Sequence, residues 1–402
     1  MTKISLNQIT MKRFLLVFSL ILLFVSELAS VYFIMPLPGS QKQNTLPFAY
    51  WLHNNLAWIR TLLLVVIFFT ALPVFRSSRR WPKIAVSVTL LLYGAIYYMV
   101  HFQMSADRMF YQPNQVDMVP VSGNKIPAGK LIIGIIDGNE AKAYPIQLIG
   151  YHHQVRDSIN GKPVMVTYCT VCRTGRVYSP EVNGKPENFR LVGMDHFNAM
   201  FEDETTRSWW QQVNGNAVVG PLKGKQLTEI PSRQMSLEKW LQLYPQSLIL
   251  QQDSTFREIY EKMDKYDKGS GNSDLTRRDS LSWKDKSWVI GIQDGTYAKA
   301  YDWNQLLSKQ LIEDSASGKS WLLWVEKDSS SFHVFNRKLD TLTLAFRVQN
   351  DSLRDVQTSS TWNSGGWAVD GPLKGRHLEN IPAYQEFWHS WRQFHPGTLK
   401  GD

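Results

Sequence analysis

The sequence predicts a membrane-anchored protein with three N-terminal transmembrane α-helices followed by a duplicated, mainly antiparallel β (α+β) extracytoplasmic domain. Three observations support this fold class: apolar stretches near the N-terminus, an internal repeat in the remainder, and short apolar runs that end in turn pairs. We expect a membrane region at 1–105, a first β-rich repeat at 106–255, a connector at 256–282 and a second β-rich repeat at 283–402.

The apolar stretches near the N-terminus cover residues 14–34, 56–75 and 84–100. Each approaches the roughly 20 residues that a helix needs to cross a hydrocarbon core of about 30 Å. The first stretch also fits a signal peptide, because Lys12 and Arg13 precede its apolar run. With either interpretation, we expect the lipid bilayer to be a partner of this region.

Basic residues in short loops predict the orientation of these helices. They precede the first stretch and separate the second from the third, at Lys3, Lys12, Arg13, Arg76, Arg79, Arg80 and Lys83. Since both regions then lie in the cytoplasm, the third helix leads outwards. We expect a multi-pass protein of the bacterial inner (cytoplasmic) membrane, with everything after about Met104 on the periplasmic side.

The formal net charge of +9 belongs mainly to the membrane region. Residues 1–105 carry nine basic side chains and one acid, Glu27, which leaves a net charge of only +1 for the other residues. The large C-terminal part therefore lacks the basic excess that binding to a phosphate backbone needs. We expect no nucleic-acid partner.

The C-terminal part contains an internal repeat. The stretch 134–144, which includes Asp-Gly and Ala-Lys-Ala-Tyr, recurs at 291–301, an offset of 157 positions. Gly-Pro-Leu-Lys-Gly at 220–224 recurs at 371–375, and Ile-Pro and a tryptophan follow in both copies. Such recurrence predicts one structural unit that is present twice.

Each copy is expected to consist mainly of strands. Apolar runs at 131–136 and 141–146 flank Asp137-Gly138, a pair typical of a hairpin turn. Further short strands are expected at 164–168, 176–179 and 189–192. A helix is predicted over 236–244 by the helical spacing of Leu237, Trp240, Leu241 and Tyr244.

The two cysteines of the chain, Cys169 and Cys172, lie three positions apart at the end of an apolar run. A short turn brings both sulfurs to one side of the backbone, so they can bind one metal ion or form a disulfide. Outside the cytoplasm, thiols seldom stay unreacted. The positions 157 residues later are Glu326 and Ser329. Only the first copy carries thiol chemistry, which predicts one reactive copy and one structural or substrate-shaping copy.

Histidines near the cysteine pair offer nitrogen ligands. His152 precedes Cys169 by 17 positions, and Met194 and His196 follow the pair. Two thiolates with one or two imidazoles suit zinc or copper, and a thioether favours Cu(I). We therefore expect the cofactor to be copper or zinc, held in a transition-metal site by Cys169, Cys172, His152 and His196.

Two alternatives stand beside the metal site. In the first, Cys169 and Cys172 form a structural disulfide in a non-catalytic binding or envelope-assembly module. In the second, the protein is a thiol–disulfide oxidoreductase, in which Arg173 lowers the pKa of Cys172. Residues 173–178 argue against the second, because they predict a turn and a strand, whereas a thioredoxin motif begins a helix. Whether the protein is an enzyme, and which proteins it binds, stays open.

These motifs resemble the bacterial family catalogued as domain of unknown function 3179. Its members carry a His-Glu and Asn-Asp stretch, a Thr-Tyr-Cys-Pro-x-Cys-Gly centre, a Ser-x-Trp segment and a Gly-Pro-Leu-x-Gly element. The corresponding stretches in this chain are 151–157, 167–173, 208–210 and 220–224. Thr170, Arg173 and His153 stand where the family has Pro, Gly and Glu. The resemblance places His152 in a family motif and implies no established activity.

Overall fold

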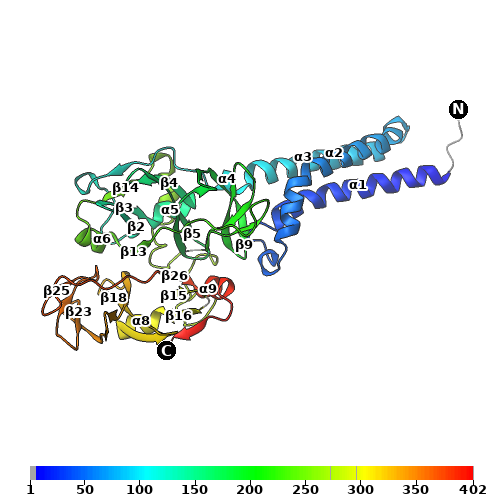
Figure 1. Ribbon diagram of the computed structural model, residues 1–402. Coiled ribbons are helices and arrows are strands. Elements are labelled where there is room, and N and C mark those ends of the chain that lie inside the picture. Colours follow the sequence, from blue (N-terminus) through cyan, green and yellow to red (C-terminus); the bar gives the residue numbers. More distant parts are fainter. Residues whose placement is uncertain (1–5, 272, 296, 402) are drawn as a thin grey trace. The chain divides into compact units, whose positions relative to one another are not determined.

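Figure 1 shows the computed structural model, which describes residues 6–271, 273–295 and 297–401. Lys3, Asn272 and Thr296 lie outside the described residues. The chain forms two compact units. The helical unit comprises the residues up to Tyr111, Phe189–Gln211 and Ala217–Lys225. The β unit comprises Gln112–Asn188, Gln212–Asn216 and the residues from Gln226 onwards.

Three long helices form most of the helical unit (Figure 1). They are α1 (Leu6–Tyr32), α2 (Leu46–Arg76) and α3 (Arg80–Tyr98), which a π-helical segment (Met99–Gln103) continues. The parts long and apolar enough to cross a membrane are Thr10–Tyr32, Leu46–Arg76 and Arg80–Gln103. The prediction of three long apolar helices is confirmed. Two short helices, η1 (Ser40–Lys42) and α4 (Ala106–Met109), complete the helical elements of this unit.

Helix α2 begins ten residues before the apolar stretch that predicted it. The polar residues Asn54 and Asn55 stand directly before the apolar stretch, and the helix runs through them. Their side-chain amides donate to the carbonyls of Tyr50 and Trp51, one turn earlier, at 3.0 and 2.7 Å. Such local bonds allow polar side chains within a helix. Hydropathy therefore marked only the apolar part of a longer helix.

Glu27, the only acid of the first 105 residues, is fully buried in α1. Its carboxylate lies 2.6 Å from Arg60 Nε of α2 and 2.9 Å from the Tyr93 hydroxyl of α3. His101 Nε2 lies 2.9 Å from its second oxygen. A buried carboxylate needs such donors, because an unpaired charge in an apolar surrounding is costly. This cluster therefore ties the three helices together.

The helical unit also contains an antiparallel sheet in the order β12-β11-β10-β9. Its strands are β9 (Phe189–Asp195), β10 (Asn198–Asp203), β11 (Trp209–Gln211) and β12 (Ala217–Val219). The Asp203 carboxylate accepts from the Ser208 backbone N–H at 3.0 Å and from Trp210 Nε1 at 2.9 Å. In the β unit, Asp355 accepts from Ser360 and Trp362 at 3.1 and 3.0 Å.

The β unit begins with ten strands and several short helices. The strands are β1 (Met118–Val119), β2 (Leu131–Asp137), β3 (Glu140–Pro145), β4 (Gln154–Ile159), β5 (Lys162–Cys169), β6 (Thr174–Tyr178), β7 (Glu181–Val182), β8 (Lys185–Pro186), β13 (Ser232–Ser236) and β14 (Leu248–Leu250). The helices are η3 (Val121–Gly123), α5 (Ile146–His152), α6 (Leu237–Leu243), η4 (Ser254–Phe256) and α7 (Arg257–Lys262). The strands and the helix predicted for this region are present.

The C-terminal part of the β unit continues with further strands and two helices. The strands are β15 (Trp288–Asp294), β16 (Tyr297–Asp302), β17 (Leu311–Ala316), β18 (Lys319–Val325), β19 (Phe332–Asn336), β20 (Lys338–Leu339), β21 (Leu342–Thr343), β22 (Phe346–Gln349), β23 (Ser352–Asp355), β24 (Thr361–Trp362), β25 (Ala368–Asp370), β26 (Ala383–Phe387) and β27 (Leu399–Gly401). The helices are α8 (Trp303–Lys309) and α9 (Trp388–Phe394).

The sheets are mostly antiparallel, as predicted. Strands β13, β2, β3 and β14 lie in one sheet, and β26, β15, β16 and β27 lie in another. In both sheets the last pair of this order is parallel and the other pairs are antiparallel. The three-stranded sheets β4-β5-β6 and β17-β18-β19 likewise have the same order. The strand order around residues 131–250 therefore recurs around residues 288–401.

At two positions, a glycine lets a tryptophan ring pack directly against a strand, because glycine has no side chain. Gly134 of β2 faces Trp240 of α6, and Gly291 of β15 faces Trp391 of α9. A Cβ added at Gly291 would lie 2.1 Å from the nearest atom of the Trp391 ring. Trp391 is fully buried, so the ring has little room to move. The glycine is required by this close approach.

Gly291→Ala should therefore destabilise the protein by about 1–3 kcal/mol, the usual cost of overpacking a core. Thermal unfolding of the purified full-length protein, followed by tryptophan fluorescence, measures the effect. Gly129→Ala is the matched control, because an added Cβ there meets nothing within 4 Å. Equal unfolding temperatures for the two variants would contradict the packing argument.

Candidate functional site

The cysteine pair lies at the end of strand β5. Cys169 is the last residue of this strand, and Cys172 lies in the turn that leads into β6. Cys169 pairs with Thr174 across the two strands, so the turn is short. Cys172 is hydrogen-bonded with Cys169, which brings the two sulfurs together as the spacing predicted. Both cysteine side chains are fully buried.

Residues from the C-terminal part of the β unit cover this turn. The backbone N–H of Phe387 donates to the Cys172 carbonyl at 2.9 Å, and Lys286 Nζ donates to the Val171 carbonyl at 2.7 Å. The imidazole at this turn is that of His389, whose Nε2 lies 3.1 Å from the Val171 carbonyl oxygen. Burial lowers the pKa of Lys286 to about 8, and the charges of the two cysteines oppose this shift.

Burial makes Cys172 a poor nucleophile. It raises the pKa of Cys172 well above its ordinary value; the bond with Cys169 adds to the shift, and the bond with Ser390 opposes it. Thiol–disulfide exchange needs the thiolate and access to a partner. The segment after the turn is strand β6 and not a helix, as the sequence predicted. The pair is better suited to a closed structural role than to exchange.

Arg173 does not act on the cysteine pair as expected. Its Nε donates to Gln385 Oε1 at 2.8 Å, and its guanidinium lies 3.7 Å from the centre of the Trp288 ring. The sequence predicted a lowered pKa for Cys172, whereas burial raises it. The side chain is held by partners from later strands, which the local sequence does not reveal.

The predicted histidine ligands have other partners. His152 ends helix α5, and its Nε2 lies 2.6 Å from the Tyr260 hydroxyl. His196 follows β9 in the helical unit, and its Nδ1 lies 2.7 Å from Asp195 Oδ1. This hydrogen bond raises the pKa of His196. Among residues 6–271, 273–295 and 297–401, no group of three or more His, Cys, Asp or Glu side chains is placed to hold a metal ion. The metal site stays a prediction.

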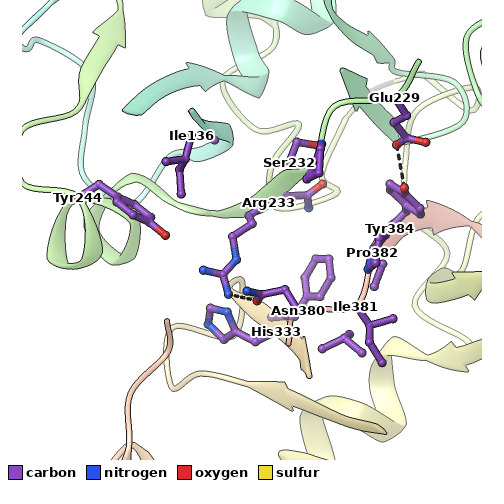
Figure 2. Close-up of a pocket in the computed structure, with 16 residues that line it drawn as sticks. Ile136, Glu229, Ser232, Arg233, Tyr244, His333, Asn380, Ile381, Pro382 and Tyr384 are labelled. Atoms are coloured by element: carbon purple, nitrogen blue, oxygen red, sulfur yellow. Dashed lines mark hydrogen bonds between the residues drawn. The ribbon is translucent and has the colours of Figure 1, made fainter. Parts of the chain in front are cut away.

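A pocket of about 370 Å³ lies elsewhere in the β unit (Figure 2). Residues of β2, β13 and the segment before β13 form one part of its lining, and β19 and the residues up to β26 form another. Its apolar lining includes Ile136, Pro231, Phe332, Val334 and Ile381. Its polar lining includes Glu229, Arg233, Tyr244, His333 and Asn380. Apolar walls with a few convergent polar groups are typical of small-molecule sites.

Two polar contacts cross this pocket (Figure 2). Arg233 Nη2 donates to Asn380 Oδ1 at 2.5 Å, and the Tyr384 hydroxyl donates to Glu229 Oε1 at 2.7 Å. The Glu229 carboxylate also lies 3.6 Å from Arg176. The negative charge of Glu229 thus has a positive neighbour.

Arg233 has a different environment. Its Nη2 also donates to the Ser364 carbonyl at 3.3 Å. Within the described part of the chain, its hydrogen-bond partners include no carboxylate. Burial disfavours the charged form of Arg233 and lowers its pKa. The pocket therefore contains a guanidinium to which no carboxylate is hydrogen-bonded among the described residues, and the charge of Glu326 acts on it only from a distance.

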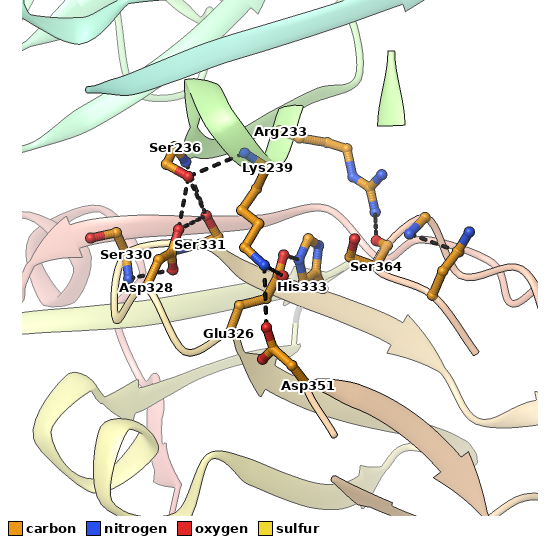
Figure 3. A network of polar contacts seen from close by, with 12 residues as sticks. Arg233, Ser236, Lys239, Glu326, Asp328, Ser330, Ser331, His333, Asp351 and Ser364 are labelled. Atoms are coloured by element: carbon orange, nitrogen blue, oxygen red, sulfur yellow. Dashed lines mark hydrogen bonds and ion pairs between the residues drawn. The ribbon is translucent and has the colours of Figure 1, made fainter. Parts of the chain in front are cut away.

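His333 of β19 forms another part of the pocket lining (Figure 3). Its Nε2 lies 2.7 Å from Glu326 Oε1, and the second oxygen of Glu326 lies 2.7 Å from Lys239 Nζ. Lys239 also pairs with Asp351 at 3.3 Å. Burial lowers the pKa of His333, so the neutral imidazole is favoured. These polar contacts form a continuous series from the partly exposed Asp351 to the pocket.

The sequence did not indicate this pocket. The 157-residue offset singled out Glu326 as the counterpart of Cys169, and the same offset relates Arg176 to His333. That comparison marked the second copy as the one without thiols. It gave no signal for Arg233, because that residue joins His333 only through tertiary packing.

The family described as "Protein of unknown function (DUF3179)" matches residues 113–398. The chain belongs to DUF3179. The resemblance inferred from the sequence motifs is thus confirmed at the level of the family. The DUF3179 match includes the cysteine pair and the pocket and leaves out the three long helices. No curated protein and no solved structure matches the chain.

The reduced cysteine pair should resist alkylation and disulfide reagents in the folded protein. Because burial disfavours the thiolate, we expect Cys169 and Cys172 to react at least about tenfold more slowly than an exposed cysteine. Reaction of the reduced full-length protein with a coloured disulfide reagent measures the rates. Ser158→Cys supplies the exposed thiol as an internal control. Equal rates for all three thiols would contradict the buried site.

His153 should contribute a pH dependence of stability. Burial lowers its pKa to about 4 in the folded protein, compared with 6.5 ordinarily. Because the unfolded chain then binds more protons, this contribution is present above about pH 6.5. It decreases by up to about 1.4 kcal/mol per pH unit as the pH falls towards 4. His153→Asn, which suits the left-handed backbone there, should reduce this slope in unfolding measurements. An unchanged slope would contradict the assignment.

Proposed function

We propose that this protein is a membrane-anchored binding module whose β unit binds a small anionic molecule in the pocket at Arg233. In this proposal, α1, α2 and α3 span the bacterial inner membrane, and the β unit lies on its extracytoplasmic side. The loop between α2 and α3 supports this orientation, because Arg76, Arg79, Arg80 and Lys83 favour the cytoplasm.

We further propose that the C-terminal part is a duplicated unit with copies at 106–255 and 283–402, joined by 256–282. The recurring sequence motifs and the recurring strand order both support a duplication. The two copies would then have diverged. The earlier copy carries the buried thiols, and the later copy carries Glu326 and His333 at matching positions.

The observation that carries the ligand proposal is the position of Arg233 in the pocket lining without a carboxylate partner among the described residues. A partly buried cation loses hydration and gains stability when an anion pairs with it. A guanidinium binds carboxylates and phosphates through two parallel hydrogen bonds. An anionic ligand would therefore supply the negatively charged hydrogen-bond partner that Arg233 lacks.

A second guanidinium without a carboxylate bond, that of Arg173, does not support a ligand site. It donates to Gln385 and to the carbonyls of Tyr266 and Asp267, and it stacks on Trp288. These partners occupy the N–H groups and one face of the guanidinium. Arg233 differs because it lines an open volume.

For the cysteine pair, we propose the structural alternative, in which Cys169 and Cys172 form a disulfide that stabilises the turn between β5 and β6. Full burial and the raised pKa of Cys172 favour this role. The copper or zinc site remains a second proposal. Metal analysis of the purified protein distinguishes the two, because a bound metal that is lost on Cys169→Ser would support the metal site.

Binding of small anions should depend on Arg233. We expect at least one of acetate, succinate, citrate and inorganic phosphate to raise the unfolding temperature of the full-length protein in detergent. Arg233→Met should weaken that binding by about 2–5 kcal/mol, the usual effect of removing one partner of a buried charge pair. Arg354→Met, in strand β23 and outside the pocket lining, is the control. Absence of binding, or equal binding by both variants, would contradict the proposal.

A further inference from the structure

His333 places a further requirement on the chemical groups of the ligand, beyond the negative charge that Arg233 requires. The imidazole is fully buried and lies between two aromatic side chains, with ring centres 5.2 Å from Trp324 and 5.9 Å from Phe335. This packing fixes the plane of the ring. The hydrogen bond from Nε2 to Glu326 fixes its rotation. The remaining nitrogen, Nδ1, therefore has a defined position.

The protonation of the ring follows from its partner. A carboxylate accepts hydrogen bonds and does not donate them, so Nε2 carries the hydrogen in the bond to Glu326. Lys239 Nζ pairs with the other oxygen of Glu326 at 2.7 Å. In the neutral imidazole, Nδ1 is then a hydrogen-bond acceptor.

This acceptor has no hydrogen-bond partner within the described part of the chain, although Nδ1 is buried. Buried polar atoms in proteins are almost always hydrogen-bonded, so one without a partner calls for an explanation. His333 forms part of the pocket lining, and Figure 2 shows the Arg233 guanidinium beside its ring. The same pocket thus presents a cation without a hydrogen-bonded carboxylate next to an acceptor that lacks a donor.

We propose that the ligand is a small 2-hydroxycarboxylate, with its carboxylate on Arg233 and its hydroxyl donating to His333 Nδ1. This inference rests on the proposed anion binding and adds the requirement for a donor. A plain carboxylate satisfies Arg233 and leaves Nδ1 without a bond. A neutral alcohol satisfies Nδ1 and leaves the guanidinium without an anion. A molecule with both groups on adjacent carbons satisfies both atoms.

Amino acids offer the same spacing with an ammonium donor, but their second group is a cation. That cation would lie beside the Arg233 guanidinium, and like charges in a partly buried site repel. The acid of the pocket, Glu229, already accepts from Tyr384 and lies near Arg176. The site therefore favours a hydroxyl over an ammonium group.

Matched ligand pairs test this inference by titration calorimetry on the full-length protein in detergent. The pairs are lactate with propionate and malate with succinate, and alanine and inorganic phosphate are competitors. We expect each hydroxy acid to bind about 3- to 10-fold more tightly than its parent acid, the usual contribution of one hydrogen bond. His333→Gln should remove this difference, because its amide can still donate to Glu326 while the Nδ1 acceptor is lost.

His377→Gln is the matched control, because His377 contacts Trp367 and the Gly365 carbonyl and does not line the pocket. It should preserve the preference for hydroxy acids. A change in the Nδ1 resonance of His333 on addition of malate, and not of succinate, gives an independent readout in the unaltered protein.

The outcomes separate the two proposals. If hydroxy acids and parent acids bind equally well and Arg233→Met abolishes both, anion binding stands and the inference about His333 is overturned. Tighter binding of alanine or phosphate than of either hydroxy acid overturns it as well. If none of these anions binds, the proposed function itself fails.

Discussion

A buried ion pair between β6 and β26 is the constraint on which the arrangement of the β unit depends. Arg176 Nη2 lies 2.8 Å from Glu386 Oε1, and both side chains are almost fully buried. Removing either charge would leave the other uncompensated, a cost of about 3–5 kcal/mol. Ser390 donates to the second oxygen of Glu386 and is hydrogen-bonded with Cys172. The ion pair therefore also helps to position the C-terminal residues that cover the cysteine turn. It also fixes β26, whose first residues line the pocket.

The polarity of the pocket follows from differences at matching positions. Glu229 and Asn380 are 151 positions apart, as are Arg233 and Tyr384, which is also the spacing of Gly220 and Gly371. In the proposed duplication, two copies that pack against each other would make each contact twice. Here one contact joins Arg233 to Asn380 and the other joins Tyr384 to Glu229. The pocket therefore has a cation at one end and, at the other, an acid with a basic neighbour.

The parts of the structure that the sequence predicted depend on neighbouring residues. The turn between β2 and β3 lies where the sequence predicted it, but its two residues are Gly138 and Asn139, because Asp137 still pairs with Glu140. Gly138 has a φ of 59°, which glycine adopts readily. Cys169 and Cys172 come together because three positions and one turn suffice. The pocket was not predicted, since Arg233 and His333 lie 100 positions apart and meet only when β13 and β19 pack. For the same reason, the partners of Arg173 and His152 could not be read from their flanking residues.

Several buried charges of the β unit are paired within the protein. Lys142 pairs with Asp157 at 3.1 Å, and Glu326 has two basic partners. Other buried polar atoms, such as Asp267 Oδ1 and Arg337 Nε, also have no hydrogen-bond partner among the described residues. Arg233 and the Nδ1 atom of His333 differ from these because they lie within one pocket. Two unrelated buried groups without partners would each destabilise the protein, and there would be no reason for them to lie near each other. Their proximity is better explained by one ligand that supplies a charge and a donor together, because functional sites are where a fold leaves such groups incomplete.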